Sequence, residues 1–204
     1  MMKLFSKKLL TAKKEIKEAD FVFMEGTTTL IAPVGELTPA KGIDYIEPYA
    51  FYKAFRHGGV DQVDVTGDVD FPDLIECPQE GFREAFFYTK ISNAKFPKLI
   101  SIGQKGFNVA FHGCKNLLTV NFASLQSVDS DGLRDAFFDC KSLTTISFPS
   151  LTTCNGTYCF FRAFYGCTAL TSIHFRADAQ SVIESQEGYS NKFNAPNATI
   201  YFDL

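Results

Sequence analysis

The chain has 204 residues, of which 46% are hydrophobic and 21% are charged, with 22 Phe and no Trp. This length suits one or two soluble domains with a sizeable core. A net charge of −3 provides no global basic field, so no nucleic-acid partner is expected. No apolar run approaches the ~18–20 residues of a membrane span, so none is expected.

Residues 1–44 are predicted to form an N-terminal cap, made of a helix over "KLFSKKLLTAKKEIKEAD" and an extended segment. Residues 21–35 within it are predicted to be a hairpin or an extended cover. The first 20 residues hold six Lys and three acidic residues. Three roles remain open for them: a solvated cap, a segment that binds a membrane surface or an anionic partner, and attachment to a larger assembly. An oligomer formed through this segment also remains open.

The first 20 residues contain no apolar core between charges, so no signal peptide is expected. The protein would then be cytoplasmic at synthesis or virion-associated, or at the cell surface if a signal has been removed. Free thiols are expected for the six Cys in a reducing compartment.

Residues 45–176 contain a repeated pattern. Ala-Phe pairs recur at 31, 25, 26 and 27 residues, each with a large apolar residue three positions before the Ala, at Ala54, Ala85, Ala110, Ala136 and Ala163. A second anchor recurs at 25, 26 and 26 residues, as "FPDL" (71–74), "FPKL" (96–99), "FASL" (122–125) and "FPSL" (148–151). A fixed period of this length is typical of stacked repeats, each too small to bury its own apolar side.

The spacing within a repeat predicts its local structure. In "LTTISF" (143–148) the last four residues alternate, as in a strand with one buried face, and Pro149 ends that strand. A second short extended segment and a polar turn follow. The apolar offsets in "FREAFFY" (82–88) favour a helical turn. In the first unit the strand pattern is assigned to Val60, Val63 and Val65, so that "TGDVD" (66–70) becomes an insertion after the strand.

The units "LTTISFPSLTTC" and "AFYGCTAL" resemble BspA-type leucine-rich repeats, although the units of that family are shorter. The resemblance implies a curved leucine-rich-repeat solenoid of about five repeats, with short stacked β-strands, short helical turns and end caps. It also implies a bacterial surface or phage-borne binding protein rather than an enzyme.

Residues 177–204 are predicted to be a C-terminal cap. A short helix over 180–193 is expected to end at Gly188. The alternation in "NATIYFDL" (197–204) predicts a closing strand with Ile200 and Phe202 on one face.

The cysteines recur with the repeats and are interpreted as core. Cys114, Cys140 and Cys167 share one repeat position, and Cys77 and Cys154 share a position that Ile102 and Val128 also occupy. A position that accepts Cys, Ile and Val is a small buried apolar site. A ladder of buried thiols is therefore favoured, with disulfides between stacked copies and a metal site as the alternatives.

No catalytic, metal or cofactor site is predicted. His57, His112 and His174 lack metal-ligand spacing, and the motifs for nucleophilic catalysis, phosphate loops and dinucleotide binding do not occur.

The candidate ligand-binding surface is the outward face of the repeated strand, where short polar side chains should stack into a column. The column consists of Gln62, Asp64, Asn93, Lys95, Thr119, Asn121, Thr145, Ser147, Ser172 and His174. Such a surface suits hydrogen bonding to a protein or carbohydrate ligand, although a solvated sheet needs the same residues. The hypothesis is a non-enzymatic protein- or glycan-binding module for surface interaction or adhesion. The alternative is a structural or host-recognition component of a phage or prophage tail.

Overall fold

The computed structural model describes short stretches of the N-terminal region and all of the chain from residue 63 onward. The described residues are 22–23, 30–31, 35–37, 44–46, 48–54 and 63–204. The expected N-terminal helix and the candidate residue Gln62 lie outside these residues.

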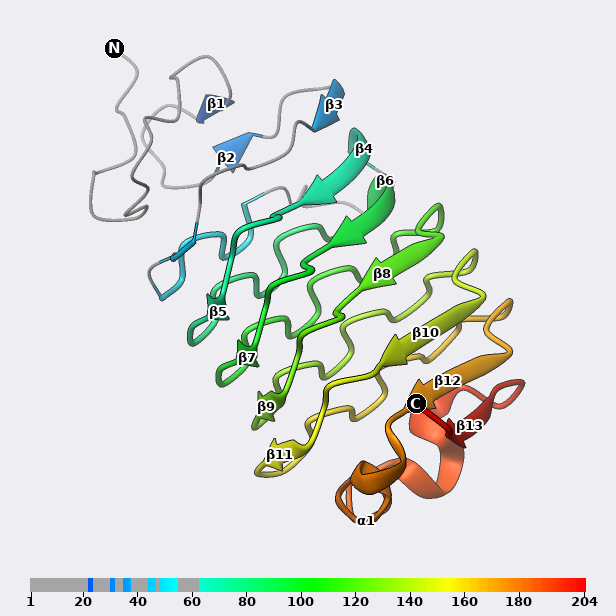
Figure 1. Ribbon diagram of the computed structural model, residues 1–204. Coiled ribbons are helices and arrows are strands. Elements are labelled where there is room, and N and C mark those ends of the chain that lie inside the picture. Colours follow the sequence, from blue (N-terminus) through cyan, green and yellow to red (C-terminus); the bar gives the residue numbers. More distant parts are fainter. Residues whose placement is uncertain (1–21, 24–29, 32–34, 38–43, 47, 55–62) are drawn as a thin grey trace.

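Each repeat contributes one strand to a long face of the molecule, which we call the strand face (Figure 1). Its strands are β3 (Gly35–Leu37), β4 (Val63–Asp70), β6 (Thr89–Lys95), β8 (Thr119–Asn121), β10 (Thr145–Phe148), β12 (Ser172–Phe175) and β13 (Thr199–Phe202). All paired neighbours are parallel, and β8 lies beside β10 without ladder pairing. In β10, Ile146 and Phe148 are buried and Thr145 and Ser147 are exposed, which confirms the predicted alternation.

A second parallel sheet follows the first in every repeat. It contains β5 (Glu76–Cys77), β7 (Ser101–Ile102), β9 (Ser127–Asp129) and β11 (Thr153–Asn155). Cys77, Ile102, Val128 and Cys154 are register partners in turn, as the shared repeat position predicted. The two sheets are joined at a corner that contains Pro72, Pro97 or Pro149, since proline cannot donate to a strand ladder.

The third side of each repeat is a ribbon of consecutive turns, and the helical turn expected over 82–88 is absent from it. In residues 80–88, 105–113, 131–139 and 158–166, every fourth residue has a positive φ, which interrupts any helix. Amide groups alternate in their partners: Phe107 donates to Gly132 of the next repeat at 2.9 Å, and Ala110 donates back to Phe107 at 3.0 Å. The ribbon therefore satisfies its backbone without being helix or sheet.

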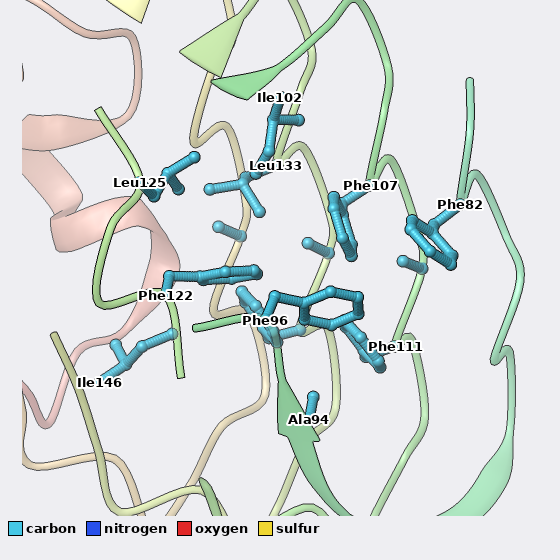
Figure 2. Packing of buried hydrophobic residues seen from close by; sticks show 14 of the residues in the cluster. Phe82, Ala94, Phe96, Ile102, Phe107, Phe111, Phe122, Leu125, Leu133 and Ile146 are labelled. Atoms are coloured by element: carbon cyan, nitrogen blue, oxygen red, sulfur yellow. The ribbon is translucent and has the colours of Figure 1, made fainter. Parts of the chain in front are cut away.

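Phenylalanine rings fill the space between the three sides (Figure 2). Phe86, Phe111, Phe137 and Phe164 form one continuous stack, with centroids 5.3, 5.7 and 5.7 Å apart and planes within 6° of parallel. Phe107 packs edge-on against Phe96 at 5.0 Å. Burial of each such side chain contributes about 1.5–3 kcal/mol, so the repeated Phe specify the stacking of the repeats.

The ends of the chain differ in part from the sequence prediction. β1 (Val22–Phe23) pairs antiparallel with β2 (Leu30–Ile31), which confirms a hairpin within 21–35. The C-terminal region contains the short helices η2 (Ala177–Ala179), α1 (Gln180–Glu184) and η3 (Tyr189–Asn194). Helix α1 ends four residues before the predicted Gly188, whose φ of 92° instead precedes η3. The predicted closing strand is β13, with Ile200 and Phe202 half-buried.

Candidate functional site

The outward side chains of the strand face form two parallel rows. Row 1 consists of Asp68, Asn93, Thr119, Thr145, Ser172 and Thr199. Row 2 consists of Asp70, Lys95, Asn121, Ser147, His174 and Tyr201. Adjacent members come from neighbouring strands, so each step along a row is about 4.8 Å.

The first pair of the predicted column is wrong. Asp68 and Asp70, rather than Gln62 and Asp64, are the register partners of Asn93 and Lys95. The pairing of β4 with β6 contains two irregularities, one between Val63 and Thr66 and one between Gly67 and Asp68. Gly67 has a φ of 84°, a conformation that accommodates a bulge. The residues interpreted as an insertion are thus part of the strand itself.

Row 1 is bonded internally. Asn93 Nδ2 donates to Asp68 Oδ1 at 2.6 Å, and Thr119 Oγ1 donates to Asn93 Oδ1 at 2.6 Å. Lys95 of row 2 also pairs with Asp68, and these bonds from Lys95 and Asn93 hold the pKa of the Asp68 carboxyl below its ordinary value. Further along, the hydroxyls of Thr145 and Ser172 lie 2.7 Å apart.

Row 2 retains unused hydrogen-bonding groups on its C-terminal half. Asn121 accepts a bond from the amide of Ala123 at 3.0 Å through its carbonyl oxygen, which leaves its NH2 group without a partner among the described residues. The hydroxyls of Ser147 and Tyr201 likewise have no partner in the described part of the chain. A ligand can bond to these groups without breaking a bond inside the protein.

His174 is the most constrained member of row 2. Its Nδ1 lies 2.9 and 3.3 Å from the two carboxylate oxygens of Asp203. The ring of Tyr201 stacks on it, with centroids 4.8 Å apart and planes 12° from parallel. With Nδ1–H donated to Asp203, neutral His174 presents Nε2 as an acceptor.

Comparison with known families gives the class of this repeat. Residues 82–186 match the family model described as the BspA type leucine rich repeat region, in six copies. The protein belongs to the BspA-type leucine-rich repeat family. Repeat regions of this kind are generally binding modules and are typically non-catalytic, and a solenoid presents an extended surface for such a role.

Two solved structures resemble this BspA-type repeat protein. One is the T. pallidum leucine-rich repeat protein, with 15% identity, a TM-score of 0.36, and coverage of 94% of this chain and 83% of that one. The other is a leucine-rich repeat protein from Bacteroides ovatus, with 15% identity, a TM-score of 0.33, and coverage of 76% of this chain and 44% of that one. No curated protein matches this chain.

The described residues of this BspA-type chain show no assembled catalytic or metal centre. Ser147 is the register partner of His174, but no hydrogen bond joins them, so a Ser–His–Asp arrangement is not formed. No cluster of three or more His, Cys, Asp or Glu able to hold a metal ion occurs among the described residues. Within the same residues, every helix is too short or too polar to span a bilayer.

The buried thiols of this BspA-type core are bonded to the neighbouring repeat. Cys114, Cys140 and Cys167 donate to the carbonyls of Phe86, Phe111 and Phe137 at 3.0, 3.1 and 2.9 Å. Burial raises the pKa of Cys114 and Cys167 to about 12 and that of Cys140 well above its ordinary value. This geometry confirms the predicted thiol ladder, and all six Cys are free.

Sequence reasoning missed a second surface, on the turn ribbons. The rings of Phe87, His112, Phe138 and Tyr165 stack in order, with centroids 4.8, 4.4 and 4.6 Å apart. The Arg162 guanidinium lies 5.2 Å from the Phe138 ring. Because the faces of the rings cover each other, the stack presents mainly ring edges to solvent. Its signal was the aromatic residue after each Ala-Phe pair, which the Ala-Phe anchor overshadowed.

Asp203 and Tyr201 were also missed as candidate residues. Tyr201 follows His174 by 27 residues, the spacing that separates Ser147 from His174. Continuing the repeat by one more period would have found it. Asp203 carries no such signal, because it contacts His174 from beyond the end of β13.

Proposed function

We propose that this protein is a non-enzymatic binding module for surface interaction or adhesion, which holds a protein or glycan ligand against row 2 of the strand face. One observation carries the proposal. Asn121, Ser147, His174 and Tyr201 lie in line on four successive strands and retain hydrogen-bonding groups that no described residue uses. Row 1 groups, in contrast, bond to each other.

The spacing of row 2 suits an extended ligand. Four positions at about 4.8 Å span roughly 14 Å, which is the length of four extended peptide residues or about three pyranose units. The charged members of the row, Asp70 and Lys95, lie at the opposite end, and Lys95 is paired with Asp68. The available half of row 2 therefore favours ligands that bind through hydrogen bonds and ring contacts.

The test is a surface plasmon resonance screen of the full chain against immobilised extracellular-matrix proteins and glycans. A ligand found in this way is then measured with Ser147→Arg, which places a long cation in the middle of row 2. Thr152→Arg is the control, because Thr152 is exposed at the edge of the other sheet. We expect at least a tenfold loss of affinity in Ser147→Arg and less than a twofold change in Thr152→Arg. Equal affinity in both variants would exclude row 2 as the binding surface.

A further inference from the structure

The C-terminal end of row 2 combines an exposed aromatic ring with oriented polar groups. Tyr201 exposes 42% of its surface, and the side chains of Asp203 and His174 expose 49% and 26%. Ser147 lies beside His174 on the adjacent strand. These four residues place a ring, a carboxylate, an imidazole nitrogen and a hydroxyl on one small area.

The rigidity of this area comes from contacts already present in the protein. His174 covers one face of the Tyr201 ring, and the Asp203 carboxylate fixes the His174 ring through Nδ1. The parallel register of β10, β12 and β13 holds Ser147, His174 and Tyr201 in line. A ligand that binds here meets preorganised groups, so little conformational entropy is lost on binding.

The chemistry of these groups matches a sugar ring. The π face of an aromatic ring carries partial negative charge, and the C–H bonds on the apolar side of a pyranose carry partial positive charge. The hydroxyls of the same sugar can donate to the Asp203 carboxylate and to Nε2 of His174, and can accept from the hydroxyls of Ser147 and Tyr201. A ligand with both an apolar face and many hydroxyls satisfies all four residues at once.

The charges around the area favour a neutral sugar. Asp203 is an acid on the area itself, and an anionic sugar would bring its charge toward this carboxylate. The nearest cation along the strand, Arg176, is already paired through Nη2 with Asp178 at 2.7 Å. No unpaired Arg or Lys among the described residues of β10, β12 and β13 offers a counter-charge.

We propose that Ser147, His174, Tyr201 and Asp203 form a subsite for a neutral saccharide, with one pyranose ring on Tyr201 and its hydroxyls on the other three residues. This inference rests on the proposed function, because it assigns the ligand class of the same row. A protein ligand that uses row 2 without a saccharide would satisfy the proposed function and exclude the subsite.

Saturation-transfer NMR on the full chain tests the subsite, with cellotetraose, mannotetraose and chitotetraose as neutral probes and a sulfated tetrasaccharide as the anionic probe. We expect transfer to the ring C–H protons of at least one neutral probe and none to the anionic probe. Tyr201→Ala should weaken that binding about tenfold, and Tyr201→Phe, which keeps the ring, by less than about threefold. Tyr165→Ala is the matched control, because Tyr165 is exposed to 48% on the turn ribbon, and it should bind as the parent does.

The outcomes separate the two proposals. If no neutral probe binds, or if Tyr201→Ala and Tyr165→Ala bind equally well, the saccharide subsite is wrong. If in addition a protein ligand from the plasmon-resonance screen is lost in Ser147→Arg, the proposed function still holds. Because Tyr201→Phe keeps the stacking on His174, its thermal unfolding shows whether an effect of Tyr201→Ala comes from misfolding.

Discussion

Asp68 of β4 lies directly beside Asn93 of β6 and accepts a hydrogen bond from its amide at 2.6 Å, although 25 residues separate them. Lys95 binds the other oxygen of the same carboxylate. This contact fixes the register of the strand face at its N-terminal end, because a shift of the pairing by one residue would turn Asp68 toward the core.

The Asp68–Lys95 contact predicts a pH dependence of stability. The pKa of Asp68 is lowered in the folded protein, first by the bond from Lys95 and then by that from Asn93. A lowered pKa stabilises the fold above the pKa of the unfolded chain, about 3.9, and this stabilisation is lost as the pH falls through the folded value. Both side chains are partly exposed, so solvent screening limits the pair to about 0.2–1 kcal/mol.

A double-mutant cycle with Asp68→Asn and Lys95→Met, measured by urea unfolding, tests this prediction. The coupling energy should be favourable at pH 7 and should vanish near pH 2.5. A coupling energy that is the same at both values would show that the carboxylate charge does not contribute.

The buried thiols should be chemically inert in the folded protein. Alkylation requires the thiolate, and burial raises the pKa of Cys114 and Cys167 to about 12. Iodoacetamide at pH 8 should therefore leave Cys114, Cys140 and Cys167 unmodified, and peptide mass spectrometry should find all six Cys modified after denaturation in urea. Rapid modification of Cys140 in the native state would contradict the thiol ladder.

Val109 has a φ of 60°, a left-handed conformation that a β-branched residue adopts at a cost of about 1–3 kcal/mol. Asn tolerates this conformation, and Val109 is only half-buried, so little packing is lost on substitution. Val109→Asn should stabilise the protein by about 0.5–1 kcal/mol, which is a rise of about 1–4 °C in the thermal midpoint. Leu118→Asn is the control: Leu118 is exposed to 51% and its φ is not positive, so no stabilisation is expected there. A lower midpoint in Val109→Asn would show that side-chain packing outweighs the backbone strain.

The repeat spacing predicted the strand face from Asn93 onward, since one Phe, Leu or Ile per position is enough to set the inward direction of each strand. The first repeat failed because its two anchors disagree. The Ala-Phe pairs belong to the turn ribbon, whereas the stack of Phe71 on Phe96, at 5.6 Å, follows the 25-residue spacing of the "FPDL" anchor. Only the second anchor reports on the strand.

The turn ribbons could not be predicted from apolar spacing. Phe82, Ala85 and Phe86 have the offsets of a helix, and a chain of turns with a left-handed residue at every fourth position buries the same offsets. Glu84 and Tyr88 occupy these positions although neither type favours a positive φ. Interrepeat hydrogen bonds, which no local pattern encodes, stabilise that backbone. The pairing of His174 with Asp203 is hidden for the same reason, because it depends on tertiary structure.

The most direct test of row 2 compares two truncations on one strand. Asn121 and Thr119 lie two residues apart on β8, and both are exposed, but Thr119 belongs to row 1 and bonds to Asn93. For a ligand captured in the binding screen, Asn121→Ala should raise the dissociation constant about three- to tenfold, since one hydrogen bond is lost. Thr119→Ala should change it by less than twofold. A larger loss in Thr119→Ala, or no loss in Asn121→Ala, would contradict the assignment of row 2 as the binding surface.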